Sequence, residues 1–225
     1  MFLLAPWKLE SNPMHRGGLA WANGLLIATN ILFYYLGVAG AVSPASPLVN
    51  VLLYGFCHAG LWHLTGNLWL LWLFGSPVNR RLGNGLYLSI YLGTIVVLGL
   101  FARYFIAVPM LGSSGGVYAI IALAVLLEPR AILNLFAIAV FPLTAIIGIF
   151  ASPAKTHEWF IRWQTVRLPL LTGLVVVPLL LLGELLQYGW NWATTAHLSG
   201  FVCGLIAVLL LPTRITLRRS TLAAA

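Results

Sequence analysis

Residues 112–130 read GSSGGVYAIIALAVLLEPR, an apolar run that opens in a glycine-rich turn and ends at charged residues. The run from Ser114 reaches Glu128 after about 14 residues, which is roughly 21 Å of helix at 1.5 Å per residue. A full crossing of the membrane takes about 20 apolar residues. We therefore predict a short helix that begins inside the membrane, with the rest of the fold around it.

The composition is that of an integral membrane protein. Of the 225 residues, 61% are hydrophobic and 7% are charged, and the mean hydropathy is +0.98. A soluble domain carries about 25% charged residues. No linker between the apolar runs is long enough to enclose a soluble domain, so we predict one all-α polytopic membrane domain.

The apolar runs predict six membrane spans. We expect them at about 19–40, 51–74, 86–107, 114–127, 168–188 and 195–212. The first run lacks a convincing cleavage site, so it is interpreted as a span and not as a signal peptide.

The remaining segments are expected outside the bundle. Residues 1–18 form a cytoplasmic or interfacial N-terminal segment, residues 19–212 hold the six-helix membrane domain, and residues 213–225 form a basic cytoplasmic tail. Residues 131–167 are interpreted as a non-spanning insertion on the cytoplasmic side, because Pro142 interrupts their apolar part.

The basic residues indicate the side on which each loop lies. The net charge is +8, and the Lys and Arg residues lie in short loops, where they determine topology and do not indicate a nucleic-acid surface. If Arg80, Arg81 and Arg130 are cytoplasmic, then every Lys and Arg except Arg103 is cytoplasmic. The run 131–150 then begins and ends on the same side, so it does not cross the membrane once.

Polar side chains inside the apolar runs are functional candidates, because they are costly in a membrane. They are His58, His63, Asn67, Ser114, Glu184 and His197. The predicted topology allows all of them to lie toward the outer side. Cys57 and Cys203 show no metal-ligand spacing, so we expect no disulfide, no metal and no cofactor.

Ser114 stands in the glycine-rich turn that opens the short helix. The first NH groups of a helix have no partner within the helix, so the Ser114 NH is free to hold an oxyanion beside a nucleophilic hydroxyl. Gly115 and Gly116 allow a neighbouring helix to approach closely. Taken alone, the motif fits a small-residue packing patch equally well.

His63 and Asn67 lie four residues apart and therefore share one face of a helix. Both side chains can donate hydrogen bonds in the same direction, which suits an oxyanion hole. Taken alone, the pair is better explained as a hydrogen-bonding contact between helices.

His197 is followed by Gly200 and Gly204, which form a GxxxG-like face one helical turn below it. Such a face allows close packing against another helix. If that helix is the one that begins at Ser114, His197 comes within reach of the serine as its general base. The glycine pair by itself indicates only helix packing.

Together the three motifs resemble those of the rhomboid family of intramembrane serine proteases. The family pattern is His-x-x-x-Asn, then Gly-x-Ser-Gly, then Ala-His-x-x-Gly-x-x-x-Gly. This chain has them in that order at 63–67, 112–115 and 196–204. The resemblance covers about residues 55–204 and implies a six-transmembrane-helix rhomboid-like bundle.

The resemblance implies serine endopeptidase activity on peptide bonds in or near transmembrane segments. Ser114 would be the nucleophile and His197 its base, while His63, Asn67 and the Ser114 NH would form the oxyanion hole. Tyr118 would pack against the His197 ring. The other supporting residues implied by the resemblance are His58, Gly112, Gly115 and Gly200.

The resemblance also implies partners and surroundings. The substrates would be single-span membrane proteins in the lipid bilayer, and no nucleic acid is expected. The compact chain indicates a bacterial inner membrane with cytoplasmic termini. Water must reach the site, so we expect a polar cavity with His58, Thr65 and Asn67 in its lining. The family requires no third acid, so Glu184 is interpreted as a packing or gating residue.

Two other functions stay open. A catalytically inactive rhomboid-like protein would bind transmembrane helices, although such relatives are expected to lack the nucleophile or the base. A small transporter or channel would use Ser114, His63 and His197 as a polar pathway. That function predicts internal repeats, and the two halves of the sequence show none.

Overall fold

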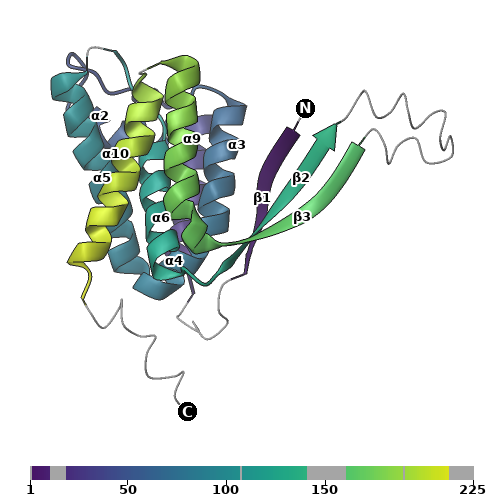
Figure 1. Cartoon of the computed structure of the whole chain (residues 1–225). Coiled ribbons are helices and arrows are strands. Elements are labelled where there is room, and N and C mark those ends of the chain that lie inside the picture. The colour runs from purple at the N-terminus through teal and green to yellow at the C-terminus, as the bar shows by residue number, and fades with distance from the viewer. Residues whose placement is uncertain (1, 11–18, 107, 141–160, 190, 213–225) are drawn as a thin grey trace. The chain divides into compact units, whose positions relative to one another are not determined.

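The computed structural model describes residues 2–10, 19–106, 108–140, 161–189 and 191–212. The chain divides into two units (Figure 1). One consists of residues 1–11 and 130–170, and the other of residues 12–129 and 171–225. The second unit is helical and holds all the candidate site residues.

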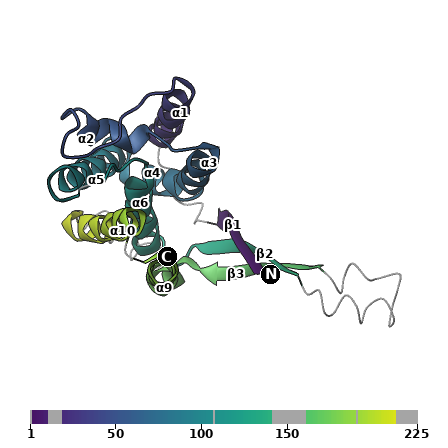
Figure 2. The same ribbon diagram turned by 90° about the horizontal axis from the view of Figure 1, so that it is seen from above.

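The helical unit is built around one short central helix. Figure 2 shows α6 inside the bundle, with α3, α5 and α10 around it. The long helices of the unit are α1 (Trp21–Tyr35), α3 (Leu61–Leu70), α5 (Asn84–Phe105), α6 (Ser114–Leu127), α9 (Gly173–Tyr188) and α10 (Trp192–Leu210). The shorter elements are α2 (Asn50–Leu53), η1 (Tyr54–Phe56), the π-helical η2 (Leu71–Gly75), α4 (Ser76–Leu82) and η4 (Leu170–Thr172).

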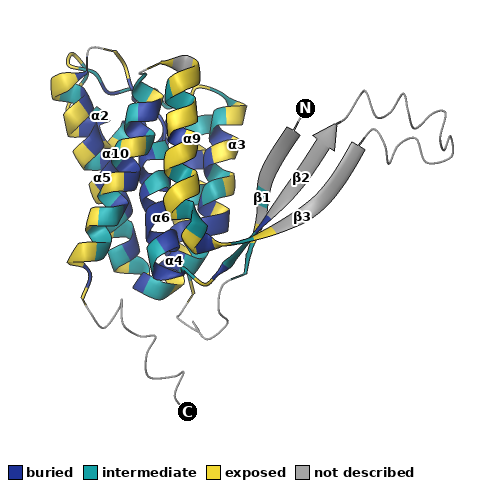
Figure 3. Cartoon of the chain, in the orientation of Figure 1, coloured by how far each residue is buried: buried dark blue, intermediate teal, exposed yellow. Residues whose placement is uncertain are grey.

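Helix α6 is central because it is apolar on every side. It has 14 residues and begins at Ser114, as the sequence predicts. Most of its side chains are buried, which Figure 3 shows as dark blue, whereas α9 is mostly exposed. Exposed apolar side chains on the outer helices fit a lipid environment.

Three helices in the described part of the chain are long and apolar enough to cross a membrane. They are Asn84–Phe105, Leu170–Gln187 and Trp192–Leu210. The chain is therefore a mostly helical membrane protein. Helices α1 and α6 are shorter, with 15 and 14 residues, so helix length does not confirm the expected count of six spans.

The helix that corresponds to the second expected span lies further along the chain than predicted. Helix α3, η2 and α4 continue one another from Leu61 to Leu82, whereas the prediction was 51–74. Residues 50–56 form separate short elements before this helix. One contact that fixes them is the hydrogen bond that the Tyr54 hydroxyl donates to the Ile95 carbonyl at 2.8 Å. The Tyr54 carbonyl also accepts from the Gly112 NH at 2.9 Å. These tertiary contacts outweigh the apolar pattern.

The prediction of an all-α chain is wrong for the other unit. Its strands β1 (Phe2–Glu10), β2 (Ile132–Val140) and β3 (Ile161–Pro169) form one antiparallel sheet in the order β1-β2-β3. β1 pairs with β2 across more than a hundred residues of chain, and the apolar run of β2 shows no regular alternation that distinguishes a strand from a helix. Residues 141–160, which include Pro142, lie outside the described residues.

An ion pair links the two outer strands of this sheet, β1 and β3. Glu10 on β1 pairs with Arg167 on β3 at 2.9 Å and with Lys8 at 3.3 Å. The hydrogen bond from Lys8, together with the positive charge of Arg167, holds the pKa of Glu10 below its usual value. These groups are exposed, so the pairs add little stability.

A buried polar network joins α1 to the helix from Leu61 to Leu82. A π-helical segment shifts the backbone hydrogen-bonding pattern of its helix, and the Leu71 carbonyl accepts a hydrogen bond from Asn23 Nδ2 at 3.0 Å. The same nitrogen donates to Ser76 Oγ at 3.1 Å, and the Tyr87 hydroxyl donates to Asn23 Oδ1 at 2.6 Å. The Asn23 NH donates to Asn79 Oδ1 at 3.1 Å. Asn23 thus connects three parts of the bundle.

Replacing this residue tests the network. We expect Asn23→Leu to destabilise the protein by about 1–3 kcal/mol, because it leaves the Leu71 carbonyl, the Ser76 hydroxyl and the Tyr87 hydroxyl, on two other helices, without this partner. The measurement is the unfolding temperature in detergent. The matched control is Asn30→Leu, since Asn30 is equally buried on α1 but its side chain donates within its own helix, to Leu26. Equal losses in the two variants would contradict the assignment.

Candidate active site

Ser114 is the first residue of α6, and the turn before it requires glycine. Gly112 has φ +122°, a backbone conformation that other residues rarely adopt. A Cβ atom at Gly112 would also lie 2.7 Å from Cε1 and 2.8 Å from Nε2 of His63. Gly112 therefore lets the His63 ring lie directly against the turn that carries Ser114.

Helix α10 packs against α6 at backbone distance. A Cβ atom on Gly200 would collide with the Gly115 carbonyl, and one on Gly204 would collide with the Ala119 carbonyl. In the described part of the chain, α6 and α10 make the most extensive contact between helices. The glycine face on the last helix therefore packs on the helix of Ser114, as the spacing indicated.

This packing places Ser114 and His197 on the wall of one cavity. The cavity has a volume of about 500 Å³ and is also lined by His63, Asn67 and Tyr118. The two residues do not hydrogen-bond to each other in the described structure, and the bond between a nucleophile and its base is often long before substrate binds.

The expected cavity lining is correct for Asn67 and wrong for His58 and Thr65. Thr65 lies on the exposed face of α3 and donates to the Trp62 carbonyl at 3.2 Å. His58 Nε2 lies 3.2 Å from Ser113 Oγ, so this histidine contacts the serine beside Ser114 and does not line the cavity. Its ring stands 5.0 Å from the His63 ring.

Asn67 has one amide hydrogen available for a ligand. Its Nδ2 donates to the His63 carbonyl at 2.9 Å, one helical turn before it. An amide nitrogen carries two hydrogens, so the second is free to donate into the cavity that Asn67 lines.

Two side chains hold the His197 ring. The Tyr118 ring stacks on it, with centroids 4.4 Å apart and an angle of 14° between the planes. This is the contact that the resemblance implied. The second partner is Glu184, whose Oε2 lies 3.2 Å from His197 Nδ1. From the sequence, Glu184 was interpreted as a packing or gating residue. The feature of the sequence that pointed to Glu184 was the cost of a carboxylate in an apolar helix.

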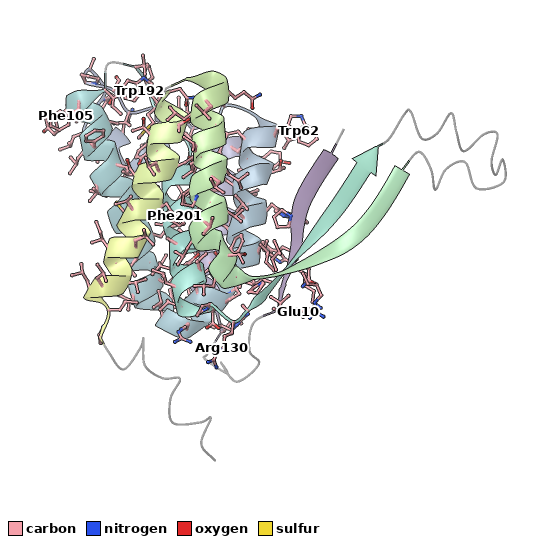
Figure 4. The ribbon with its side chains drawn as sticks, in the orientation of Figure 1. Glu10, Trp62, Phe105, Arg130, Trp192 and Phe201 are labelled. Atoms are coloured by element: carbon pink, nitrogen blue, oxygen red, sulfur yellow. The ribbon has the colours of Figure 1, made fainter. Side chains whose placement is uncertain are left out.

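The cavity lies toward one end of the helical unit. Trp62 and Trp192 both line it, and Figure 4 shows them at the same end of the unit as Phe105, while Phe201 lies further down the bundle. Tryptophan is enriched where membrane meets water. The two tryptophans that line the cavity are therefore of the residue type expected near the membrane surface.

A helical membrane protein with this site has the features of the family that its motifs resemble. The profile of the family described as Rhomboid domain matches residues 45–214. The chain belongs to the rhomboid family.

Curated relatives are similar over part of their length. The chain is 30% identical over 125 residues to Rhomboid protein 1, mitochondrial, of Saccharomyces cerevisiae, covering 51% of this chain and 35% of that protein. It is 31% identical over 173 residues to the Presenilin-associated rhomboid-like protein, mitochondrial, of Mus musculus, covering 63% and 46%. The human protein of that name is 28% identical over 138 residues, covering 53% and 36%.

The chain thus spans about a third to a half of the length of the curated relatives it matches. The names of these relatives place them in mitochondria. They give no support to the expected bacterial inner membrane.

The close packing of α10 on α6 predicts opposite effects for two glycine substitutions. We expect Gly200→Ala to lower the unfolding temperature, because its methyl group would meet the Gly115 backbone. The control is Gly93→Ala on α5, where a Cβ atom meets nothing within 4 Å. It should leave the unfolding temperature unchanged or raise it, since alanine favours helix by about 1 kcal/mol. A rise in both variants would contradict the packing.

Proposed function

We propose that this protein is an intramembrane serine endopeptidase that uses Ser114 and His197 as a catalytic dyad. The observation that carries the proposal is that both residues line one cavity together with His63 and Asn67. A nucleophile, a base and candidate oxyanion donors in one place are what acyl transfer requires. Membership of the rhomboid family supports the same function.

The reaction begins when neutral His197 takes the proton of the Ser114 hydroxyl. The oxygen attacks the carbonyl carbon of the substrate, and the leaving amine receives the proton from the imidazolium. Water then enters the cavity, attacks the acyl-enzyme and regenerates Ser114.

The oxyanion of the tetrahedral intermediate needs donors that are already oriented. We assign this role to the Ser114 NH at the start of α6, the free amide hydrogen of Asn67 and the His63 ring. The close approach of His63 to Gly112 supports this role, because it brings the imidazole to the turn that carries the nucleophile.

The substrate class follows from the surroundings of the site. A transmembrane helix pairs its own carbonyl groups, so it must unwind locally before a peptide bond is accessible. We propose single-span membrane proteins with small or helix-destabilising residues near the outer end of the span.

The membrane topology is part of the proposal. The six spans are α1, the helix from Leu61 to Leu82, α5, α6, α9 and α10, with both termini and residues 131–167 on the cytoplasmic side. Arg103 is the exception to the positive-inside pattern, and it donates a hydrogen bond to the Ser46 carbonyl.

Substitution of the dyad is the direct test. We expect Ser114→Ala and His197→Ala each to lower kcat/KM by more than about 10³-fold, because each removes a group that reacts. The assay uses purified protein in liposomes and a panel of single-span substrates, with a fluorophosphonate probe to label the nucleophile.

Ser113→Ala is the matched control for this test. Ser113 contacts His58 and does not line the cavity, so we expect cleavage to persist and the probe to label Ser114. Cleavage that survives Ser114→Ala would refute the mechanism. Binding of single-span peptides by a wild-type protein that neither cleaves them nor reacts with the probe would favour the inactive alternative.

The oxyanion hole is tested on α3. We expect Asn67→Ala to lower kcat by about 10²–10³-fold with little change in KM, because the donor acts mainly on the transition state. Thr65→Ala is the control, since Thr65 lies on the same helix with its side chain exposed. An unchanged kcat for Asn67→Ala would exclude this residue from the oxyanion hole.

A further inference from the structure

Glu184 contacts the proposed catalytic base from a different helix. Its Oε2 lies on α9 and reaches Nδ1 of His197 on α10 at 3.2 Å, with side chains 25% and 19% exposed. The chain has only four acidic residues. Glu10 and Glu128 pair with basic side chains, and Glu158 lies outside the described residues. Glu184 is the described carboxylate that pairs with a histidine.

The position of Glu184 is costly for the helix that carries it. From Gly173 to Gly183, α9 contains only apolar residues, glycine and one proline. A carboxylate in a membrane-spanning segment is expensive and marks a functional site by default. Glu184 contacts the imidazole of His197, so we expect it to act on that imidazole.

The contact decides which ring nitrogen carries the proton. A carboxylate at Nδ1 favours the tautomer with hydrogen on Nδ1, which leaves the lone pair on Nε2. The stack of Tyr118 on the ring restricts its rotation. Nε2 is then the nitrogen available to Ser114, on the wall of the cavity that both residues share.

We propose that Glu184 is a positioning residue that holds His197 in its base-competent tautomer and stabilises the imidazolium formed during the reaction. The proton moves from Ser114 Oγ to His197 Nε2 and later to the leaving amine. Glu184 keeps its hydrogen bond to Nδ1–H and exchanges no proton. This role rests on the proposed protease function and extends the dyad to three residues.

Three polar side chains face the His197 ring. They are Glu184 on α9, Tyr118 on α6 and His63 on α3. Of these three, Glu184 is the carboxylate, so it is the group that can accept a hydrogen bond from Nδ1–H and place a negative charge beside the imidazolium. Replacing Glu184 by glutamine therefore tests the charge separately from the shape.

The variants are Glu184→Gln, which keeps the shape without the charge, and Glu184→Asp, which keeps the charge on a shorter side chain. We expect Glu184→Gln to lower kcat at least about tenfold with little change in KM, since general base catalysis contributes about 10²–10⁴-fold. Glu184→Asp should restore part of the loss. Gly183→Ala is the control, because a Cβ atom there meets nothing within 4 Å.

A second measurement does not depend on turnover. The imidazole ¹⁵N signals of histidine-labelled protein, assigned with His197→Ala, should show Nδ1 protonated in the wild type and a mixture of tautomers in Glu184→Gln. Unchanged signals, or an unchanged kcat in a Glu184→Gln variant of an active enzyme, would overturn the role of Glu184. A wild type without cleavage or probe labelling would instead overturn the protease function on which the role rests.

Discussion

The close approach of α6 and α10 is the constraint on which the site depends. Lipid tails are as apolar as leucine, so helices in a membrane associate through packing and hydrogen bonds. Gly200 and Gly204 let the last helix meet the backbone of α6 directly. Ser114 begins α6 and His197 lies in the second turn of α10. Both reach one cavity because the glycines below them let the two helices pack closely. The position of the two site residues therefore depends on Gly200 and Gly204 having no side chain.

Polar groups inside this bundle serve two different ends. Asn23 joins three segments of the bundle through its amide and its backbone NH, and Arg81 forms an ion pair with Glu128 at 3.1 Å in which both side chains are almost fully buried. These groups are matched by partners of complementary chemistry and hold the bundle together. Glu184 differs, because its partner is a ring on the wall of the cavity.

The sequence predicted the parts of the fold that depend on local chemistry. The bounds of α6 were accessible because a glycine turn and a charged end enclose one apolar run. The start of the second span was misplaced because Tyr54 is held by partners on other elements. The β1–β2 pairing could not be predicted because Lys8 and Asn134 are 126 residues apart, and β2 itself is an apolar run without strand periodicity. The contact between Glu184 and His197 could not be predicted because the two residues lie on different helices. Gly189, with φ +71°, lies in the connection that brings these helices side by side.

The π-helical segment Leu71–Gly75 constrains the length of the helix that contains it. A π-helical turn holds one residue more than an α-helical turn. Its first carbonyl, that of Leu71, accepts a hydrogen bond from the Asn23 side chain on α1. Asn23 also bonds to Ser76 on the same helix and to Tyr87 on α5. Loss of one residue from this segment should therefore turn Ser76 by about 100° away from Asn23, because each residue of an α-helix turns it by about that angle.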